Sequence, residues 1–238
     1  MTPQPPQPIT SLDDPRTLQI LSTEHWSLLT SRSLAYNEAF TRGGMFLTFL
    51  STSFVALALV SQAMSFGTEF LTLTAIILAF DLVIGLATFG RILGANADDL
   101  RAVHGMARIR HAYTQAAPIV TRYFTTATHD DMTAVTTAYG SLPIGGMGNL
   151  LYAMTTSGGM IGLITSMVGG VLAGVLGLIV GLGGGLSVWI GVGGAVLVFV
   201  ALGALAAASI PREQARLTVL FPTPGGAEGA DALGREGT

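Results

Sequence analysis

The sequence contains a run of 80 residues, from Met132 to Pro211, without a single Asp, Glu, Lys or Arg. About a quarter of the residues in an ordinary globular domain are charged, so a water-soluble core does not account for such a run. Half of the whole chain is hydrophobic and only 11% is charged. Together these features predict a chain that folds in a lipid bilayer.

Two apolar blocks have the length of transmembrane hairpins. A helix needs about 20 residues to cross roughly 30 Å of hydrocarbon. The first block, residues 45–93, is divided by a short turn at 65–69. The second block, residues 158–210, is divided by the glycines at 181–185. The sequence therefore predicts an all-α polytopic membrane protein with four transmembrane helices in two hairpins.

All eleven basic residues are arginines, and they lie outside the two apolar blocks or at their edges. Three precede the first block, five lie at its end or between the blocks, and three follow the second. Because arginine-rich segments stay on the cytoplasmic side, this distribution predicts that both termini and the middle segment are cytoplasmic. The net charge of −3 offers no concentrated basic face for nucleic acid, so no nucleic-acid partner is expected.

The segment before the first block is predicted to form one cytoplasmic element. Residues 1–11 are proline-rich and expected to be disordered, whereas 12–42 are expected to form an amphipathic helix that ends at Gly43–Gly44. At the other end of the chain, 211–238 are predicted to be a cytoplasmic tail, disordered from about residue 221.

The segment between the two blocks is predicted to contain a second cytoplasmic helix. It covers residues 94–128, either as a separate helix or as a continuation of the second span, and is expected to bend or break at Pro118. Residues 129–157 are rich in glycine and lack a regular period, which predicts a loop with one interfacial helix at 149–154.

Asp81 is the one ionisable side chain inside a predicted span, near the middle of the bilayer. A carboxylate there costs at least ~2.5 kcal/mol on insertion scales, so it is expected to face the protein interior and to find a hydrogen-bond partner. Antiparallel pairing with the first span places Asp81 opposite residue 55. The nearest hydroxyl side chains are Ser51, Thr52 and Ser53. Two interpretations stay open: a buried clasp between helices, or a site for a proton or cation.

Small residues are predicted to form a helix-packing face on the second hairpin. Its members on the third and fourth spans are Gly170, Gly174, Gly177, Gly181, Gly185, Gly191 and Ala195. Small residues four apart let helix backbones approach closely in lipid. Packing within the hairpin, self-association and the lining of a pore are the alternatives for this face.

The sequence lacks motifs for catalysis or metal binding. It contains no cysteine, no phosphate-binding or dinucleotide-binding glycine motif and no GxSxG. No two histidines are spaced for metal binding on one helix face. A non-enzymatic protein without cofactor or metal is therefore expected.

Several short segments carry a resemblance to a known family. They are Leu21-Ser22-Thr23-Glu24-His25-Trp26, Arg32-Ser33-Leu34 with Asn37-Glu38, Met45-Phe46-Leu47-Thr48, Asn96 with Asp98, Gly105-Met106-Ala107-Arg108-Ile109-Arg110-His111-Ala112-Tyr113, and Arg122-Tyr123-Phe124. Over residues 18 to 131 the chain resembles a family of uncharacterised bacterial integral membrane proteins. The resemblance implies a bacterial inner-membrane location but no activity. In layout alone, the chain is also similar to small transmembrane effectors of bacterial antiphage systems.

These observations lead to two alternative functions. The first is a homo-oligomer in the lipid bilayer whose spans form an ion-permeable path, gated by the cytoplasmic helices. The second is a membrane-anchored scaffold whose cytoplasmic helices bind a protein partner.

Overall fold

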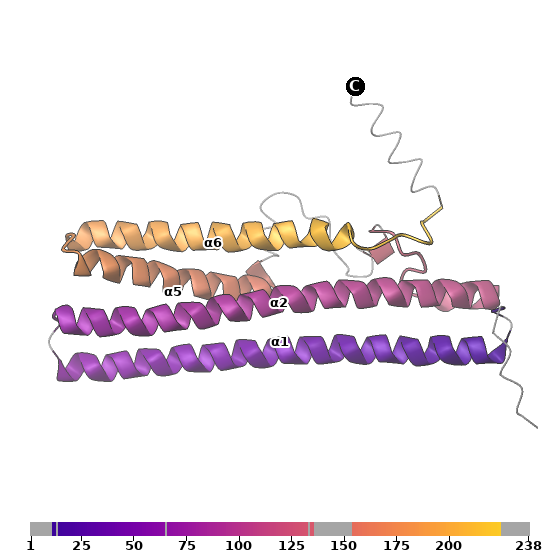
Figure 1. The fold of residues 1–238 in the computed structure, drawn as a ribbon, viewed down its shortest axis with the longest axis horizontal. Helices are drawn as coiled ribbons and strands as arrows, with labels where there is room; N and C mark the ends of the chain where they lie inside the picture. Colours follow the sequence, from indigo (N-terminus) through magenta and orange to yellow (C-terminus); the bar gives the residue numbers. More distant parts are fainter. Residues whose placement is uncertain (1–10, 13, 65, 133, 136–153, 225–238) are drawn as a thin grey trace, which may run out of the picture. The chain divides into compact units, whose positions relative to one another are not determined.

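The computed structural model describes the chain from Ser11 to Pro224, except for residues 13, 65, 133 and 136–153. The helices, in chain order, are α1 (Pro15–Ala63), α2 (Thr68–Ala116), the short 3-10 helix η1 (Pro118–Tyr123), α5 (Ser157–Ile179) and α6 (Gly184–Gln214), as Figure 1 shows. No strand occurs in the described residues, so the predicted all-α fold is confirmed for them. Most of the predicted 129–157 loop, with its interfacial helix, lies outside the described residues, as do residues 1–10 and 225–238.

Helices α1, α2, α5 and α6 are each long and apolar enough to cross a membrane. Both α1 and α2 have 49 residues. At ~1.5 Å per residue such a helix is roughly 74 Å long, more than twice the ~30 Å hydrocarbon core. Each of these two helices therefore contains one candidate span and a long extension beyond it. Helix α5 has 23 residues and α6 has 31, which is closer to the length of a single span.

Helix α1 is continuous where the sequence predicted a joint. The pair Gly43–Gly44 lies inside the helix, so the predicted end at residue 42 is wrong. A glycine inside a helix costs only about 1 kcal/mol relative to alanine. The packing of a long helix outweighs that cost, and Gly43 itself is buried near Ile161 of α5.

Helix α2 continues from the second candidate span into the following segment, which is one of the two alternatives that the sequence left open. It ends at Ala116, just before Pro118 begins η1. Proline lacks an N–H donor and disfavours helical geometry in the preceding residue, so the predicted break at Pro118 is confirmed. The prediction of a helix as far as residue 128 is wrong beyond Ala116.

The second apolar block is divided into two helices, as predicted. Gly181 lies in the connecting turn with a φ of 87°, a left-handed conformation that glycine adopts without a steric penalty. Helix α6 continues beyond the predicted end at residue 210, with Pro211 inside its last turn.

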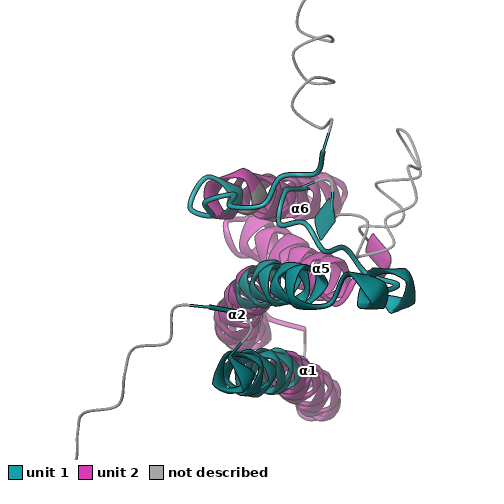
Figure 2. Ribbon diagram, turned by 90° about the vertical axis from the view of Figure 1, so that its right-hand side faces the viewer, with its two compact units in different colours: residues 1–35, 98–142, 214–238 teal, residues 36–97, 143–213 magenta. Residues whose placement is uncertain are grey.

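The chain forms two compact units, which Figure 2 colours separately. Unit 1 consists of residues 1–35, 98–142 and 214–238, and unit 2 of residues 36–97 and 143–213. In unit 1, Val103, Met106 and Val135 form a buried apolar cluster, with Leu28 and Leu100 packed against it.

Unit 1 also contains part of the tail that was predicted to be disordered. Residues 221–224 are described, and the ring of Phe221 stacks on His111 with the centroids 4.1 Å apart. The prediction of disorder from residue 221 is therefore wrong for residues 221–224. No local pattern near residue 221 indicates this contact, because the aromatic partner lies 110 positions earlier in the chain.

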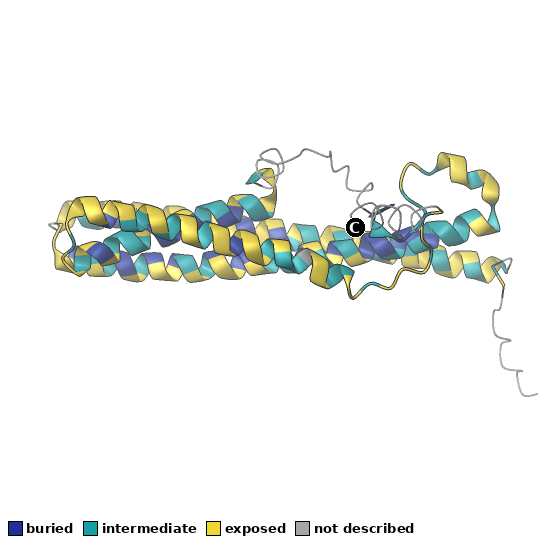
Figure 3. Ribbon diagram, turned by 90° about the horizontal axis from the view of Figure 1, so that it is seen from above, coloured by how far each residue is buried: buried dark blue, intermediate teal, exposed yellow. Residues whose placement is uncertain are grey.

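Large hydrophobic side chains are exposed on the outside of unit 2. Figure 3 shows exposed positions along all four of its helices. Trp189 of α6 is 74% exposed, and Phe54, Phe80 and Val171 are exposed on the other three. In the candidate span of α6 only 6% of the residues are buried. Extended apolar surface of this kind marks contact with a membrane or a protein.

Candidate functional site

Asp81 lies on the buried face of α2 in unit 2, with 1% of its surface exposed. Leu78, Asp81 and Gly85 are three and four residues apart, which puts them on one side of the helix, and all three are buried. The hydroxyl of Ser53, on α1, donates a hydrogen bond of 3.0 Å to Oδ1 of Asp81. This bond joins the two antiparallel helices within unit 2.

The second carboxylate oxygen of Asp81 has no hydrogen-bond partner among the described residues, although it is buried. The hydroxyl of Thr165, on α5, is buried and equally without a partner there. Thr165 lies against Gly85, one helix turn from Asp81: a Cβ atom at Gly85 would be 2.7 Å from the Thr165 hydroxyl oxygen. Buried polar groups are nearly always hydrogen-bonded, so two exceptions on neighbouring turns identify this region as the candidate site.

Ser53 is one of the three hydroxyl residues predicted near Asp81, and it lies two positions from the predicted opposite residue, 55. Ser51 and Thr52 do not take part: their hydroxyls donate to the carbonyl oxygens four residues earlier in α1 and are exposed.

Sequence reasoning missed Gly85 and Thr165. Gly85 was detectable in principle, since it follows Asp81 by four residues. Thr165 carried no signal, because the sequence does not indicate which face of α5 contacts α2. The ring of Phe46, from α1, also lies 3.0 Å from the Cβ position of Gly85, so three helices meet at this glycine.

Part of the predicted glycine face forms the contact between α5 and α6. A Cβ atom at Gly170 would be 2.6 Å from both Ala195 Cβ and the carbonyl oxygen of Gly191. The Cβ position of Gly174 lies 3.1 Å from the carbonyl oxygen of Ser187 and 3.7 Å from Cα of Gly191. The Cβ position of Gly177 lies 3.0 Å from the Ser187 hydroxyl. These glycines allow backbone-to-backbone contact within a single chain.

Gly181 and Gly185 do not belong to this face. Neither has a neighbouring atom within 4 Å of its Cβ position, and Gly181 serves the turn instead. Gly194 was missed and does belong, since its Cβ position is 2.9 Å from Ala173. A groove of about 550 Å³ runs along the same helix pair, and Ser187 is the one polar residue in its lining. Such a lining offers almost no oxygen ligands for an ion.

A cluster of charged side chains lies at one end of the candidate spans of α1 and α2. Arg91 forms a two-point ion pair with Glu38, with nitrogen-to-oxygen distances of 2.6 and 3.1 Å. Arg42 donates to the same carboxylate at 2.9 Å. The hydrogen bonds from Arg91 and then Arg42 lower the pKa of Glu38 to about 2. This carboxylate therefore stays ionised at any physiological pH.

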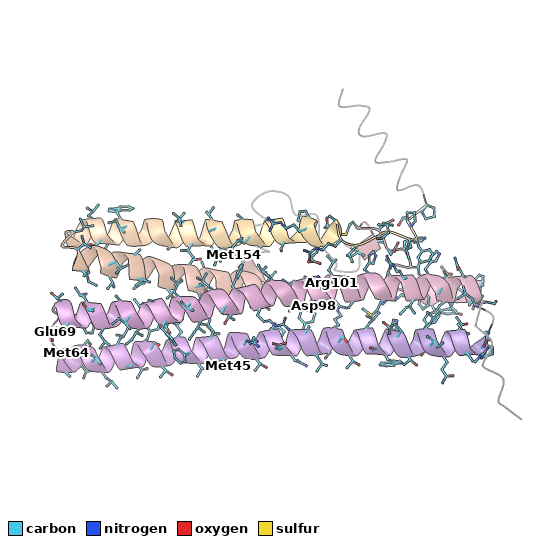
Figure 4. All side chains as sticks on the ribbon, in the orientation of Figure 1. Met45, Met64, Glu69, Asp98, Arg101 and Met154 are labelled. Carbon is cyan, nitrogen blue, oxygen red and sulfur yellow. The ribbon has the colours of Figure 1, made fainter. Side chains whose placement is uncertain are left out.

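Two neighbouring acidic residues of α2, Asp98 and Asp99, form ion pairs. Figure 4 labels Asp98 and Arg101, one turn apart on α2, which form a surface ion pair of 3.1 Å. Buried Asp99 pairs with Arg32 of α1 within unit 1. Figure 4 also labels Glu69, in the first turn of α2. Among the described residues, no group of three or more His, Asp or Glu side chains is placed to hold a metal ion.

Among the described residues, Asp81 is therefore the buried carboxylate that keeps one oxygen without a hydrogen-bond partner. Comparison with protein-family models, with curated proteins and with solved structures finds no match for this chain.

Proposed function

We propose that the protein resides in the bacterial inner membrane, with α1–α2 and α5–α6 crossing the bilayer as two hairpins and with unit 1 in the cytoplasm. The four long apolar helices and the exposed hydrophobic surface of unit 2 support membrane residence. The arginine distribution supports the orientation. Arg91 lies at the end of the second predicted span, and six arginines lie in the parts of unit 1 at residues 1–35 and 98–142.

Within this arrangement, the protein passes protons or small cations across the membrane by way of Asp81, without catalysing a reaction. The observation that carries this function is the fully buried carboxylate, one oxygen of which has no donor in the part of the chain that the structure describes. An ionisable group at membrane depth is costly, and its usual roles are in ion or proton pathways. A clasp that only holds α1 and α2 together requires no more than the hydrogen bond from Ser53 to Asp81.

The glycine face does not support self-association, because α6 of the same chain occupies it. A homo-oligomer remains a prediction that follows from conduction, since one four-helix unit has little room for a continuous path. Gating by unit 1 likewise remains a prediction.

A scaffold is the second candidate, and exposed apolar residues outside the candidate spans favour it. Trp26 and Leu34 of α1 are 65% and 64% exposed. Large exposed apolar side chains on a water-facing helix are typical of a protein-binding surface. Exchanging the membrane helices for an unrelated hairpin separates the two functions: a scaffold retains its biological effect, whereas a conducting protein loses it.

The decisive experiment measures proton and cation flux from liposomes that contain the purified protein. Asp81→Asn removes the ionisable group and keeps the side-chain shape. Asp98→Asn is the matched control, since it makes the same change at an exposed carboxylate. We expect flux in the wild type and the control, and at least a tenfold loss in Asp81→Asn. Equal flux in all three proteins, or none from folded protein, would refute conduction through Asp81.

Membrane orientation has its own test. The chain has no cysteine, so single cysteines at Gly67, Gly184 and Ala116 can be labelled selectively. The orientation predicts that an impermeant thiol reagent outside the cell labels Gly67→Cys and Gly184→Cys. Labelling of Ala116→Cys without the other two would reverse the topology.

A further inference from the structure

Residues 218–223 follow α6 and are held in unit 1 by several hydrogen bonds. The carbonyl oxygen of Thr218 accepts a hydrogen bond from Arg108. It also lies 3.2 Å from Nε2 of His104. Both partners are on α2, so the segment is fixed to a helix that lies more than 100 positions earlier in the chain.

The side chain of Asp130, which is 0% exposed, is the centre of this attachment. It accepts hydrogen bonds from the amides of Leu220 at 3.0 Å and Phe221 at 2.7 Å. Arg108 donates to it at 2.8 Å. Burial opposes ionisation, but the hydrogen bonds from Leu220, Arg108 and Phe221 outweigh it and hold the pKa of Asp130 below its usual range. The carboxylate is therefore charged and saturated with donors.

Neighbouring groups extend the attachment on both sides. The amide of Asp130 donates back to the carbonyl oxygen of Phe221 at 3.1 Å. Asp131 accepts hydrogen bonds from the amides of Thr223 and Ala134. The Phe221 ring stacks on His111 with an interplanar angle of 21°. The adjacent carboxylates at 130 and 131 thus bind backbone amides.

The segment is held by its backbone, with little apolar burial. Val219 and Leu220 are 45% and 55% exposed, so hydrophobic packing adds little beyond the Phe221 ring. If the segment leaves, Asp130 keeps its ion pair with Arg108 and no isolated buried charge results. Both the attached and the released state are therefore physically accessible.

We propose that residues 218–223 form a latch that restrains the end of α6 by attaching it to unit 1. Helix α6 ends at Gln214, four residues before Thr218. Four fully extended residues span roughly 14 Å, so the end of α6 stays within that distance of Thr218. In the closed latch Thr218 is bound to His104 and Arg108, which restrains the helix end relative to α2. The latch is a conformational device of this chain and does not depend on conduction through Asp81.

Two proline substitutions test the latch. Leu220→Pro removes an amide that binds Asp130, while the side chain it replaces is largely exposed. Val219→Pro is the matched control, because the described residues offer no acceptor to the Val219 amide. The readouts are hydrogen exchange at the amides of Phe221 and Thr223 and the mobility of a spin label at Ala215→Cys, just after α6.

We expect exchange to be about tenfold faster or more in Leu220→Pro, since a bond to a buried carboxylate is lost. The label should become more mobile in that variant, and both readouts should stay near wild type in Val219→Pro. Unchanged exchange at Val103 and Met106 establishes that unit 1 remains folded. Equal exchange in both variants, or faster exchange with unchanged label mobility, would overturn the latch.

If Leu220→Pro unfolds unit 1, a side-chain variant tests the latch instead. Phe221→Ala keeps every backbone amide and removes the stacking on His111. It should raise exchange at Thr223 and the mobility of the label, by less than the loss of an Asp130 bond does. No change in either readout would also overturn the latch.

Discussion

Replacing Gly170 with alanine tests the contact between α5 and α6 most directly. The new Cβ atom would lie 2.6 Å from the Cβ atom of Ala195 and 2.6 Å from the carbonyl oxygen of Gly191. The oxygen belongs to the backbone, so no side-chain rotation relieves the clash. The optimal separation of non-bonded heavy atoms is about 3.5–4.0 Å, so the two helices must separate locally by roughly 1 Å.

The expected loss of stability follows from two opposing effects. Overpacking of this kind costs about 1–3 kcal/mol. The replacement of a helical glycine by alanine returns about 0.5–1 kcal/mol through backbone entropy and helix propensity. Gly193→Ala in α6 isolates the second effect, because no atom lies within 4 Å of its Cβ position. The difference between the two variants therefore measures the overpacking alone, about 1–3 kcal/mol.

The assay is reversible unfolding in mixed micelles with increasing SDS, followed by the loss of helical circular dichroism. Gly170→Ala should unfold at a lower SDS fraction than the wild type, and Gly193→Ala at the same or a higher one. If Gly170→Ala is as stable as Gly193→Ala, the close contact between α5 and α6 does not exist.

Three further predictions concern unit 2. Gly85→Ala should lower the stability in the same assay by about 1–3 kcal/mol, since its Cβ atom would be 2.7 Å from the Thr165 hydroxyl; an unchanged midpoint would contradict the three-helix contact. The pKa of Glu38 is lowered from 4.5 to about 2, so its stabilising effect is fully present above about pH 4.5 and is lost as the pH falls toward 2. In Glu38→Gln the unfolding midpoint should change less between pH 4.5 and 2 than it does in the wild type. If both proteins show the same pH dependence, the ion pairs of Glu38 do not cause it. Asp81→Asn should be nearly as stable as the wild type, whereas the free energy of unfolding of Asp81→Leu should fall by about 1 kcal/mol, because the Ser53 hydroxyl is left without its acceptor. Equal stability of the wild type and both variants would contradict the clasp interpretation.

Some features of this fold are local in the sequence and were predictable. The division of the second apolar block at Gly181 and the break at Pro118 depend on residues with special backbone geometry. The continuity of α1 through Gly43 was not predictable in the same way. A glycine permits a break without requiring one, and packing decides the outcome.

Contacts between distant residues set the limit of prediction for the site. The pairing of Asp81 with Ser53 was approached to within two residues, because one short turn fixes the register of adjacent antiparallel helices. Thr165 contacts the same region from α5. The glycines and aliphatic residues of α5 do not indicate which of its faces packs against α2. The attachment of Phe221 to Asp130 joins residues 91 positions apart, through backbone amides that every sequence possesses. The pattern of side chains in the sequence therefore does not predict such a bond.

The two interpretations of Asp81 differ in what they require of its second oxygen. A clasp is complete with the hydrogen bond from Ser53, and burying a second oxygen without a donor only adds to its cost. An ion or proton site needs that oxygen, because a group that exchanges its ligand must have an atom that the protein does not already occupy. Asparagine keeps an acceptor for Ser53 and cannot ionise, so it preserves the clasp and abolishes the site. Normal stability of Asp81→Asn together with lost flux therefore identifies an ion site, whereas normal stability together with normal flux leaves only the clasp.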